Sequence, residues 1–198
     1  MGVVIILTGI GSVGKSSVAN ALKNKFAKDL DFSIEGFDTA VEKKLEKQYW
    51  PEGSNSKEGF YYVETASGPE MQHGEKGKKF LEEMISDIIK LANSGKNIII
   101  DSVLSDAEHN RLIKEMKDCT ILQVGLKPPL QVVIDREQAR PDRKVGVAKA
   151  AYDYFYACKT FDVEIDTSKN NPDQAAAIIE QAIREKQSQH TTVNTIRP

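Results

Sequence analysis

The chain has 198 residues, 40% of them hydrophobic and 28% charged, and its formal net charge is −2 at pH 7. This length suits one domain with a sizeable core, and the small net charge argues against nucleic acid or a membrane surface as the main partner. The two cysteines, Cys119 and Cys158, lie far apart and form no metal-binding or redox motif, so we expect a reducing, cytoplasmic environment. The apolar start of the chain is too short to span a bilayer and lacks the basic flank of a signal peptide.

Short apolar runs alternate with segments of helical periodicity along the chain. The apolar runs predict strands at residues 3–7, 32–36, 97–100, 121–126 and 162–166. The other segments predict helices at about 15–28, through 41–45, from 80 to 93, from 106 through 116, after Pro129, through 152–156 and from 172 onward. Apolar strands that alternate with helices are typical of a parallel sheet covered on both faces. We therefore expect a doubly wound, five-stranded α/β domain over residues 1–186 and a polar tail at 187–198.

Residues 49–79 interrupt this alternation. The segment combines several glycines with the aromatic residues Tyr49, Trp50, Phe60, Tyr61 and Tyr62. A loop of this length within a compact domain is usually functional or disordered, and the aromatic residues argue against disorder. The sequence therefore predicts a long functional loop here.

Residues 9–17 read GIGSVGKSS and stand between the first predicted strand and the first predicted helix. The pattern Gly-x-x-x-x-Gly-Lys-Ser in this context is that of a phosphate-binding P-loop, the Walker A motif. Glycines allow consecutive backbone N–H groups to face an anion, and the start of the helix adds free N–H groups and a positive dipole end. Lys15 is predicted to reach the β- and γ-phosphates, and the Ser16 hydroxyl to ligate Mg²⁺. The predicted nucleotide-binding residues of this loop are Gly9, Gly11, Ser12, Val13, Gly14, Lys15, Ser16 and Ser17.

Three further candidates follow predicted strands, at the carboxyl edge where open α/β sheets bind ligands. Asp101 closes an apolar strand, as a Walker B carboxylate does, and is predicted to hold Mg²⁺ or its waters; the alternative is an aspartate that caps a turn. Asp38 could accept the proton of a substrate hydroxyl, but it could equally be the N-cap of the helix that follows it. Thr167 follows the last predicted strand at the same edge.

Arg136, Arg140 and Arg143 lie in a polar turn between two predicted helices. Arg136 and Arg140 are four residues apart and share a helix face, so both could reach a bound nucleotide. Because a site that transfers phosphate from ATP must exclude water, we interpret residues 140–147 as a mobile lid rather than as a solvated surface.

Two classes of function fit these residues: a small-molecule kinase, and a nucleotide-dependent switch or binding module. A GTPase switch would need the guanine-reading sequence Asn-Lys-x-Asp, which does not occur in the chain. Its absence favours the kinase.

The residues together resemble the chloramphenicol phosphotransferase family. The likeness keeps order and spacing from about residue 3 to the last helix, and it rests on the segments 9–17, 36–42 (GFDTAVE), 98–101 (IIID), 136–143 (REQARPDR) and 162–167 (DVEIDT). It implies a P-loop kinase fold and a reaction that moves the γ-phosphate of ATP to the primary hydroxyl of chloramphenicol.

The resemblance also implies roles for individual residues. In this family an aspartate after the second strand serves as the base, which implies that role for Asp38. It supports the lid role of the three arginines, and it places the adenine beside the loop at Thr167. The segment 49–65 is longer and more aromatic than the family leads us to expect; its rings either line a pocket for a flat or apolar substrate or form a local core. The predicted acceptor is therefore chloramphenicol or another hydroxylated small molecule.

Overall fold

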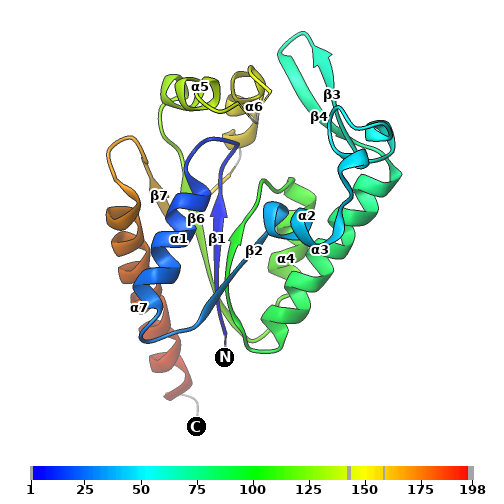
Figure 1. The fold of residues 1–198 in the computed structure, drawn as a ribbon. Helices are drawn as coiled ribbons and strands as arrows, with labels where there is room; N and C mark the ends of the chain where they lie inside the picture. Colours follow the sequence, from blue (N-terminus) through cyan, green and yellow to red (C-terminus); the bar gives the residue numbers. More distant parts are fainter. Residues whose placement is uncertain (1, 142–143, 158, 196–198) are drawn as a thin grey trace.

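A computed structural model describes residues 2–141, 144–157 and 159–195 of the chain. Its centre is a parallel sheet with the strand order β2-β5-β1-β6-β7 (Figure 1). All five strands lie where the apolar runs predict them, so the predicted five-stranded parallel sheet is confirmed. The strands are β1 (Gly2–Thr8), β2 (Phe32–Gly36), β5 (Asn97–Asp101), β6 (Cys119–Leu126) and β7 (Val163–Ile165).

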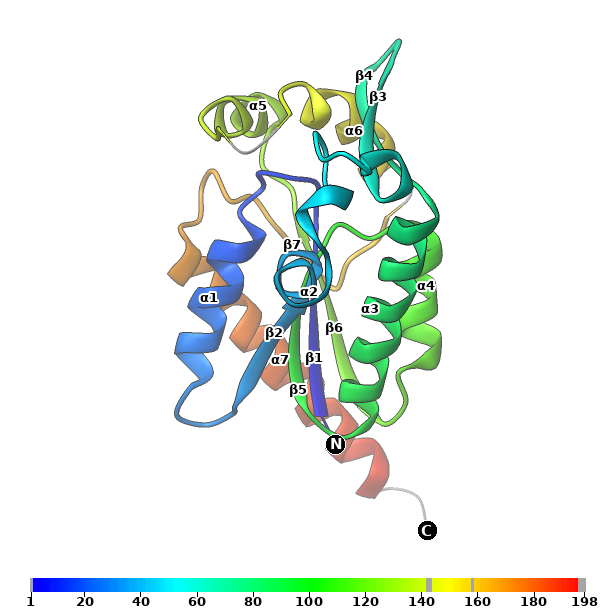
Figure 2. The same cartoon turned by 45° about the vertical axis from the view of Figure 1, so that its right-hand side comes forward.

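Helices cover both faces of this sheet (Figure 2). They are α1 (Lys15–Phe26), α2 (Phe37–Lys44), α3 (Glu75–Asn93), α4 (Asp106–Glu115), α5 (Leu130–Gln138), α6 (Val147–Tyr156) and α7 (Pro172–Thr195). Successive strand residues point to opposite faces. Accordingly, Ile5 and Leu7 of β1 belong to the core beneath α1 and α7, whereas Val4 and Ile6 belong to the core beneath α3 and α4. Because both faces are buried, β1 reads as an unbroken apolar run.

α5 and α6 lie beyond the carboxyl ends of the strands, on the side of the sheet where β1 leads into α1 (Figure 1). This arrangement places the segment between α5 and α6 over the edge at which the sequence predicts the ligand. In the described part of the chain, no helix combines the length and the apolar character that a membrane span requires.

α7 is longer than the sequence analysis expects. It runs to Thr195 and so includes most of the segment 187–198 that the expected tail covers. Neither glycine nor proline interrupts this segment before residue 198, and it opens with Gln187 and Gln189, which favour helix, so no strong helix breaker ends α7 earlier.

The insertion at residues 49–79 contains regular structure that the sequence analysis did not predict. β3 (Phe60–Thr65) and β4 (Gly68–His73) form an antiparallel hairpin. Two short 3₁₀ helices, Lys47–Tyr49 and Ser56–Glu58, precede it, and α3 begins directly after it. Most side chains of the hairpin are partly or fully exposed, so its strands lack the apolar alternation that would mark them in the sequence.

Four aromatic rings pack the insertion against α2 and α3. We call these rings the aromatic core: Phe37, Trp50, Phe60 and Phe80. Phe37 stacks on Trp50 with 5.4 Å between ring centroids, and it meets Phe60 and Phe80 edge-on at 5.2 and 5.6 Å. Phe60 and Phe80 are only 1% and 5% exposed. The sequence left open whether the aromatic residues line a pocket or form a local core. Trp50 and Phe60 belong to a local core. Since Phe37 directly precedes Asp38, this core also holds the start of α2.

Candidate active site

The P-loop residues form a tight turn between β1 and α1. Gly14 has a φ of +96°, a left-handed conformation that favours glycine, and α1 begins at the next residue. Lys15 is only 8% exposed, and its ammonium donates to the carbonyl oxygens of Gly9 (3.0 Å) and Ile10 (2.9 Å). The Ser16 side chain is exposed in the first turn of α1. A buried lysine and the N–H groups of a helix start thus lie next to each other, which is a suitable environment for a phosphate chain.

Thr167 connects the P-loop to α5. Its hydroxyl donates to the carbonyl oxygen of Val13 (2.8 Å) and accepts from the guanidinium of Arg136 (2.9 Å). The same guanidinium donates a second hydrogen bond to the Thr167 carbonyl oxygen (2.9 Å). The structure therefore brings together two of the predicted nucleotide-binding residues, Arg136 and Thr167, at the border of the P-loop.

The ends of β1, β2 and β5 bring the acidic candidates to the same edge. Asp101 pairs in register with Leu7 of β1 on one side and with Gly36 of β2 on the other. The approach of Gly36 is very close, because a Cβ atom there would lie 1.8 Å from the Asp101 carbonyl oxygen. Asp38 lies two residues after Gly36 in the sequence. The two carboxylates and the P-loop thus follow neighbouring strand ends.

Asp38 lies in the first turn of α2 with an exposed side chain. The N-cap of α2 is Gly36: the Thr39 hydroxyl accepts from its N–H and donates to its carbonyl oxygen, both at 3.0 Å. The alternative interpretation of Asp38 as the N-cap is therefore wrong. Its carboxylate stands at the surface of the carboxyl edge, where a substrate can approach it.

The predicted lid corresponds to the loop between α5 and α6. Arg140 is exposed at its start, directly after the end of α5, whereas Arg143 lies outside the described residues. Glu137 at the end of α5 is 5% exposed, and its carboxylate accepts from the N–H groups of Gly146 (2.7 Å) and Ala148 (2.8 Å). The two ends of this loop, at the end of α5 and the start of α6, therefore both lie beside the buried side chain of Glu137.

Sequence reasoning missed two residues that support this site, Glu137 and Tyr156. Tyr156 of α6 is 7% exposed and its hydroxyl donates to the carbonyl oxygen of Leu126 (2.6 Å); burial raises the pKa of this phenol. It lies beneath the start of the P-loop, since a Cβ atom on Gly9 would be 3.1 Å from its hydroxyl. A signal for Glu137 exists in the sequence: it follows the buried Val133 by four residues, so a charge stands on the apolar stripe of α5.

The candidate metal ligands are a hydroxyl and a carboxylate. Ser16 and Asp101 offer the oxygen donors that Mg²⁺ prefers, and Mg²⁺ completes its shell with waters and phosphate oxygens rather than with a full set of protein ligands. Within the described ranges, no group of three or more His, Cys, Asp or Glu side chains is placed to hold a metal. The residues present therefore fit a magnesium ion that is bound together with a nucleotide.

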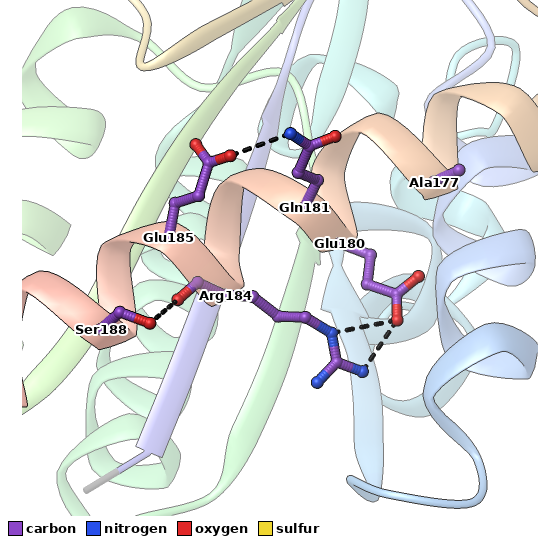
Figure 3. A pocket seen from close by; sticks show the side chains of 6 residues that line it. All are labelled: Ala177, Glu180, Gln181, Arg184, Glu185 and Ser188. Carbon is purple, nitrogen blue, oxygen red and sulfur yellow. Dashed lines mark hydrogen bonds and ion pairs between the residues drawn. The ribbon is translucent and has the colours of Figure 1, made fainter.

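A separate hollow lies along α7 (Figure 3) and contains none of the predicted site residues. It is lined by Ala177, Glu180, Gln181, Arg184, Glu185 and Ser188. Its polar side chains bond along the helix, from Arg184 to Glu180 and from Gln181 to Glu185. Two of them also pair with residues near α1: Glu180 with Lys25 (3.0 Å) and Arg184 with Asp29 (3.3 Å). This hollow is on the flank of the molecule and does not belong to the candidate active site.

Comparisons with known proteins identify the family and the fold. The family model described as chloramphenicol phosphotransferase-like protein matches residues 2–184. A comparison with curated protein sequences finds no match.

Among solved structures, similarity extends over nearly the whole chain. The APS kinase of Mycobacterium tuberculosis, in complex with AMPPNP and APS, has a TM-score of 0.61 at 18% identity, covering 92% of this chain and 98% of that chain. Shikimate kinase from Acinetobacter baumannii, in complex with shikimate, has a TM-score of 0.59 at 16% identity and covers 93% and 94%. The Deinococcus radiodurans tunicamycin resistance protein has a TM-score of 0.54 at 18% identity and covers 93% and 95%.

These structures share the fold, and the family match covers most of the chain. The chain belongs to the chloramphenicol phosphotransferase-like family, and it is a P-loop kinase with a small-molecule hydroxyl as acceptor.

Proposed function

We propose that the chain is an ATP- and Mg²⁺-dependent O-phosphotransferase that acts on chloramphenicol or a related hydroxylated compound. The observation that carries this proposal is the register of the strand ends. Gly36, Asp101 and Leu7 are neighbours across β2, β5 and β1, so the segment with Asp38 and the P-loop after β1 share one edge. A phosphate donor and a hydroxyl acceptor that bind there would meet.

The donor side consists of the P-loop and its supports. The first turn of α1 and Lys15 would hold the β- and γ-phosphates of ATP, and Ser16 and Asp101 would hold Mg²⁺. When bound, Mg²⁺ neutralises charge that develops on the phosphate oxygens. Arg136 bonds to both the hydroxyl and the carbonyl of Thr167, so its planar guanidinium is fixed beside the P-loop, where it could pack on the adenine.

The acceptor side consists of Asp38 and the loop between α5 and α6. The acceptor oxygen forms a bond to the γ-phosphorus, and the bond from that phosphorus to the β–γ bridging oxygen breaks, leaving its electron pair on ADP. Asp38 accepts the proton that the hydroxyl loses. Arg140 and Arg143 are the proposed lid cations, and closure of the lid would exclude the water that otherwise competes for the phosphate.

The test is transfer of label from γ-labelled ATP with Mg²⁺ to a panel that contains chloramphenicol, other hydroxylated antibiotics and hydroxylated metabolites. Labelled chloramphenicol would establish the family reaction for this chain, and label on another member would retain the kinase and change the acceptor. If ATP binds but no panel member is labelled, the result favours the alternative, a nucleotide-dependent switch or binding module.

A further inference from the structure

Glu137 carries a charge in a place where charges are costly. It lies on the buried stripe of α5, four residues after Val133, and is 5% exposed. A buried carboxylate needs hydrogen-bond donors, and both oxygens of Glu137 have one: the N–H groups of Gly146 and Ala148, at 2.7 and 2.8 Å. These donors belong to the start of α6, where the helix dipole also favours a negative charge.

The two hydrogen bonds close the base of the lid. The segment from Ala139 to Val145 leaves α5 directly after Glu137 and Gln138, and it returns at Gly146. One side chain thus holds the end of α5 against the beginning of α6. Any displacement of α6 relative to α5 would have to break bonds to a buried charge, so these two bonds fix the positions at which the loop joins the two helices.

The same point of the lid also touches the hairpin of the insertion. Gly146 has a φ of +100°, and a Cβ atom there would lie 3.1 Å from the Pro69 ring. A Cβ atom on Gly68 would in turn lie 3.3 Å from the Gly146 carbonyl oxygen. Lys144 and Glu64 add an ion pair at 3.2 Å. The hairpin and the loop between α5 and α6 therefore contact each other at Gly146.

On the other side, Glu137 is adjacent to Arg136, whose guanidinium bonds to Thr167 beside the P-loop. Consecutive residues of α5 thus hold the nucleotide side and the lid base. We propose that Glu137 is a positioning residue for phosphotransfer: it fixes the two ends of the loop between α5 and α6, with Arg140 at its start, beside the donor site without touching either substrate. This inference rests on the proposed function, because it assigns a task within that reaction.

The test compares Glu137→Gln with wild type in three measurements. Glutamine keeps the size but loses the charge, and its NH₂ group faces backbone N–H donors, so the lid base should loosen. We expect kcat for transfer to fall between about 10- and 100-fold, the scale of a small misplacement, with little change in the Kd for ATP. The amides of Gly146 and Ala148 should exchange with deuterium faster. More phosphate should pass to water for each acceptor that is phosphorylated, because the lid seals the site less well.

Asp135→Asn is the matched control, since this exposed acid on the same helix bonds only within it, to Gln131, among the contacts of the described residues. If Glu137→Gln fails to fold, Glu137→Asp replaces it, and its shorter carboxylate should give an intermediate loss. A folded Glu137→Gln with wild-type kcat and wild-type amide exchange would overturn the inference, and so would a loss of ATP binding equal to the loss of turnover. If wild type phosphorylates no acceptor, the proposed function fails, whereas amide exchange still decides whether Glu137 fixes the lid base.

Discussion

Lys15 lies inside the P-loop, 8% exposed, with its ammonium bonded to the carbonyl oxygens of Gly9 and Ile10. Replacing it by alanine should weaken ATP binding by about 10- to 100-fold, since a hydrogen bond to a charged group is worth roughly 1.5–3 kcal/mol. Calorimetric titration with ATP measures this change. Lys23→Ala, an exposed lysine on the same helix, is the control and should bind ATP as wild type does. Equal affinity of Lys15→Ala and wild type would refute the role of Lys15.

His73 at the end of β4 offers a pH-dependent test of the insertion. His73 is exposed as a residue, but its ring meets Phe60 edge-on at 5.2 Å, and partial desolvation of the ring lowers its pKa from the ordinary 6.5; Glu108 opposes this effect and Lys78 adds to it. The unfolded chain therefore binds the proton more readily than the folded chain. The stability that His73 contributes is present above pH 6.5 and is lost as pH falls from there through the lower folded pKa.

The measurement is an NMR titration of the His73 ring, assigned with His73→Asn. We expect a midpoint below pH 6.5. The unfolding midpoint of wild type should fall relative to that of His73→Asn as the solution is acidified below pH 6.5. A titration midpoint at or above 6.5 would contradict the packing of this ring against the hairpin.

At single residues, sequence predicts what a local pattern encodes. The P-loop is such a pattern, and Asp38 and Asp101 follow from the rule that parallel strands end at one edge. The structural role of Glu137 could not be predicted from a local sequence pattern. A carboxylate on an apolar stripe is stable only because the start of α6 supplies two N–H donors, and that partnership between elements is visible only in three dimensions.

At the scale of elements, burial decides what could be predicted. The five strands of the main sheet are covered on both faces, so their apolar runs mark them clearly. The β3–β4 hairpin has few buried side chains, Phe60 and Pro69 among them, so its pattern is too weak to recognise. The sequence analysis placed the end of α7 too early for a related reason. The last residues of this helix are mostly polar, so they show no apolar periodicity that would indicate a helix.

The aromatic core gives a prediction at this scale. Phe60 is 1% exposed and lies within 6 Å, between ring centroids, of Phe37, Trp50 and Phe80. Phe60→Ala should reduce the free energy of unfolding by about 3–5 kcal/mol, the usual range for a buried ring. Chemical denaturation measures this loss. Tyr154→Ala, which removes a ring that is 85% exposed, should change stability by less than about 0.5 kcal/mol. A small effect of Phe60→Ala would mean that the rings do not form a core.

At the scale of the whole molecule, the fold collects at one edge the groups to which we assign roles in phosphoryl transfer. The sheet order places β1 between β5 and β6, so the P-loop after β1 is next to Asp101 and one strand away from the segment with Asp38. α5 and α6 lie over this edge (Figure 1), and the hairpin meets the lid at Gly146.

The central claim is that Asp38 accepts the acceptor's proton during phosphotransfer. The most direct measurement is the rate of phosphate transfer by Asp38→Asn relative to wild type, on the panel member that wild type labels. We expect a loss of about 10²- to 10⁴-fold, the usual contribution of a general base, with unchanged affinity for ATP. Glu42→Gln, an exposed acid one turn further along α2, should keep the wild-type rate. A wild-type rate in Asp38→Asn would contradict the account.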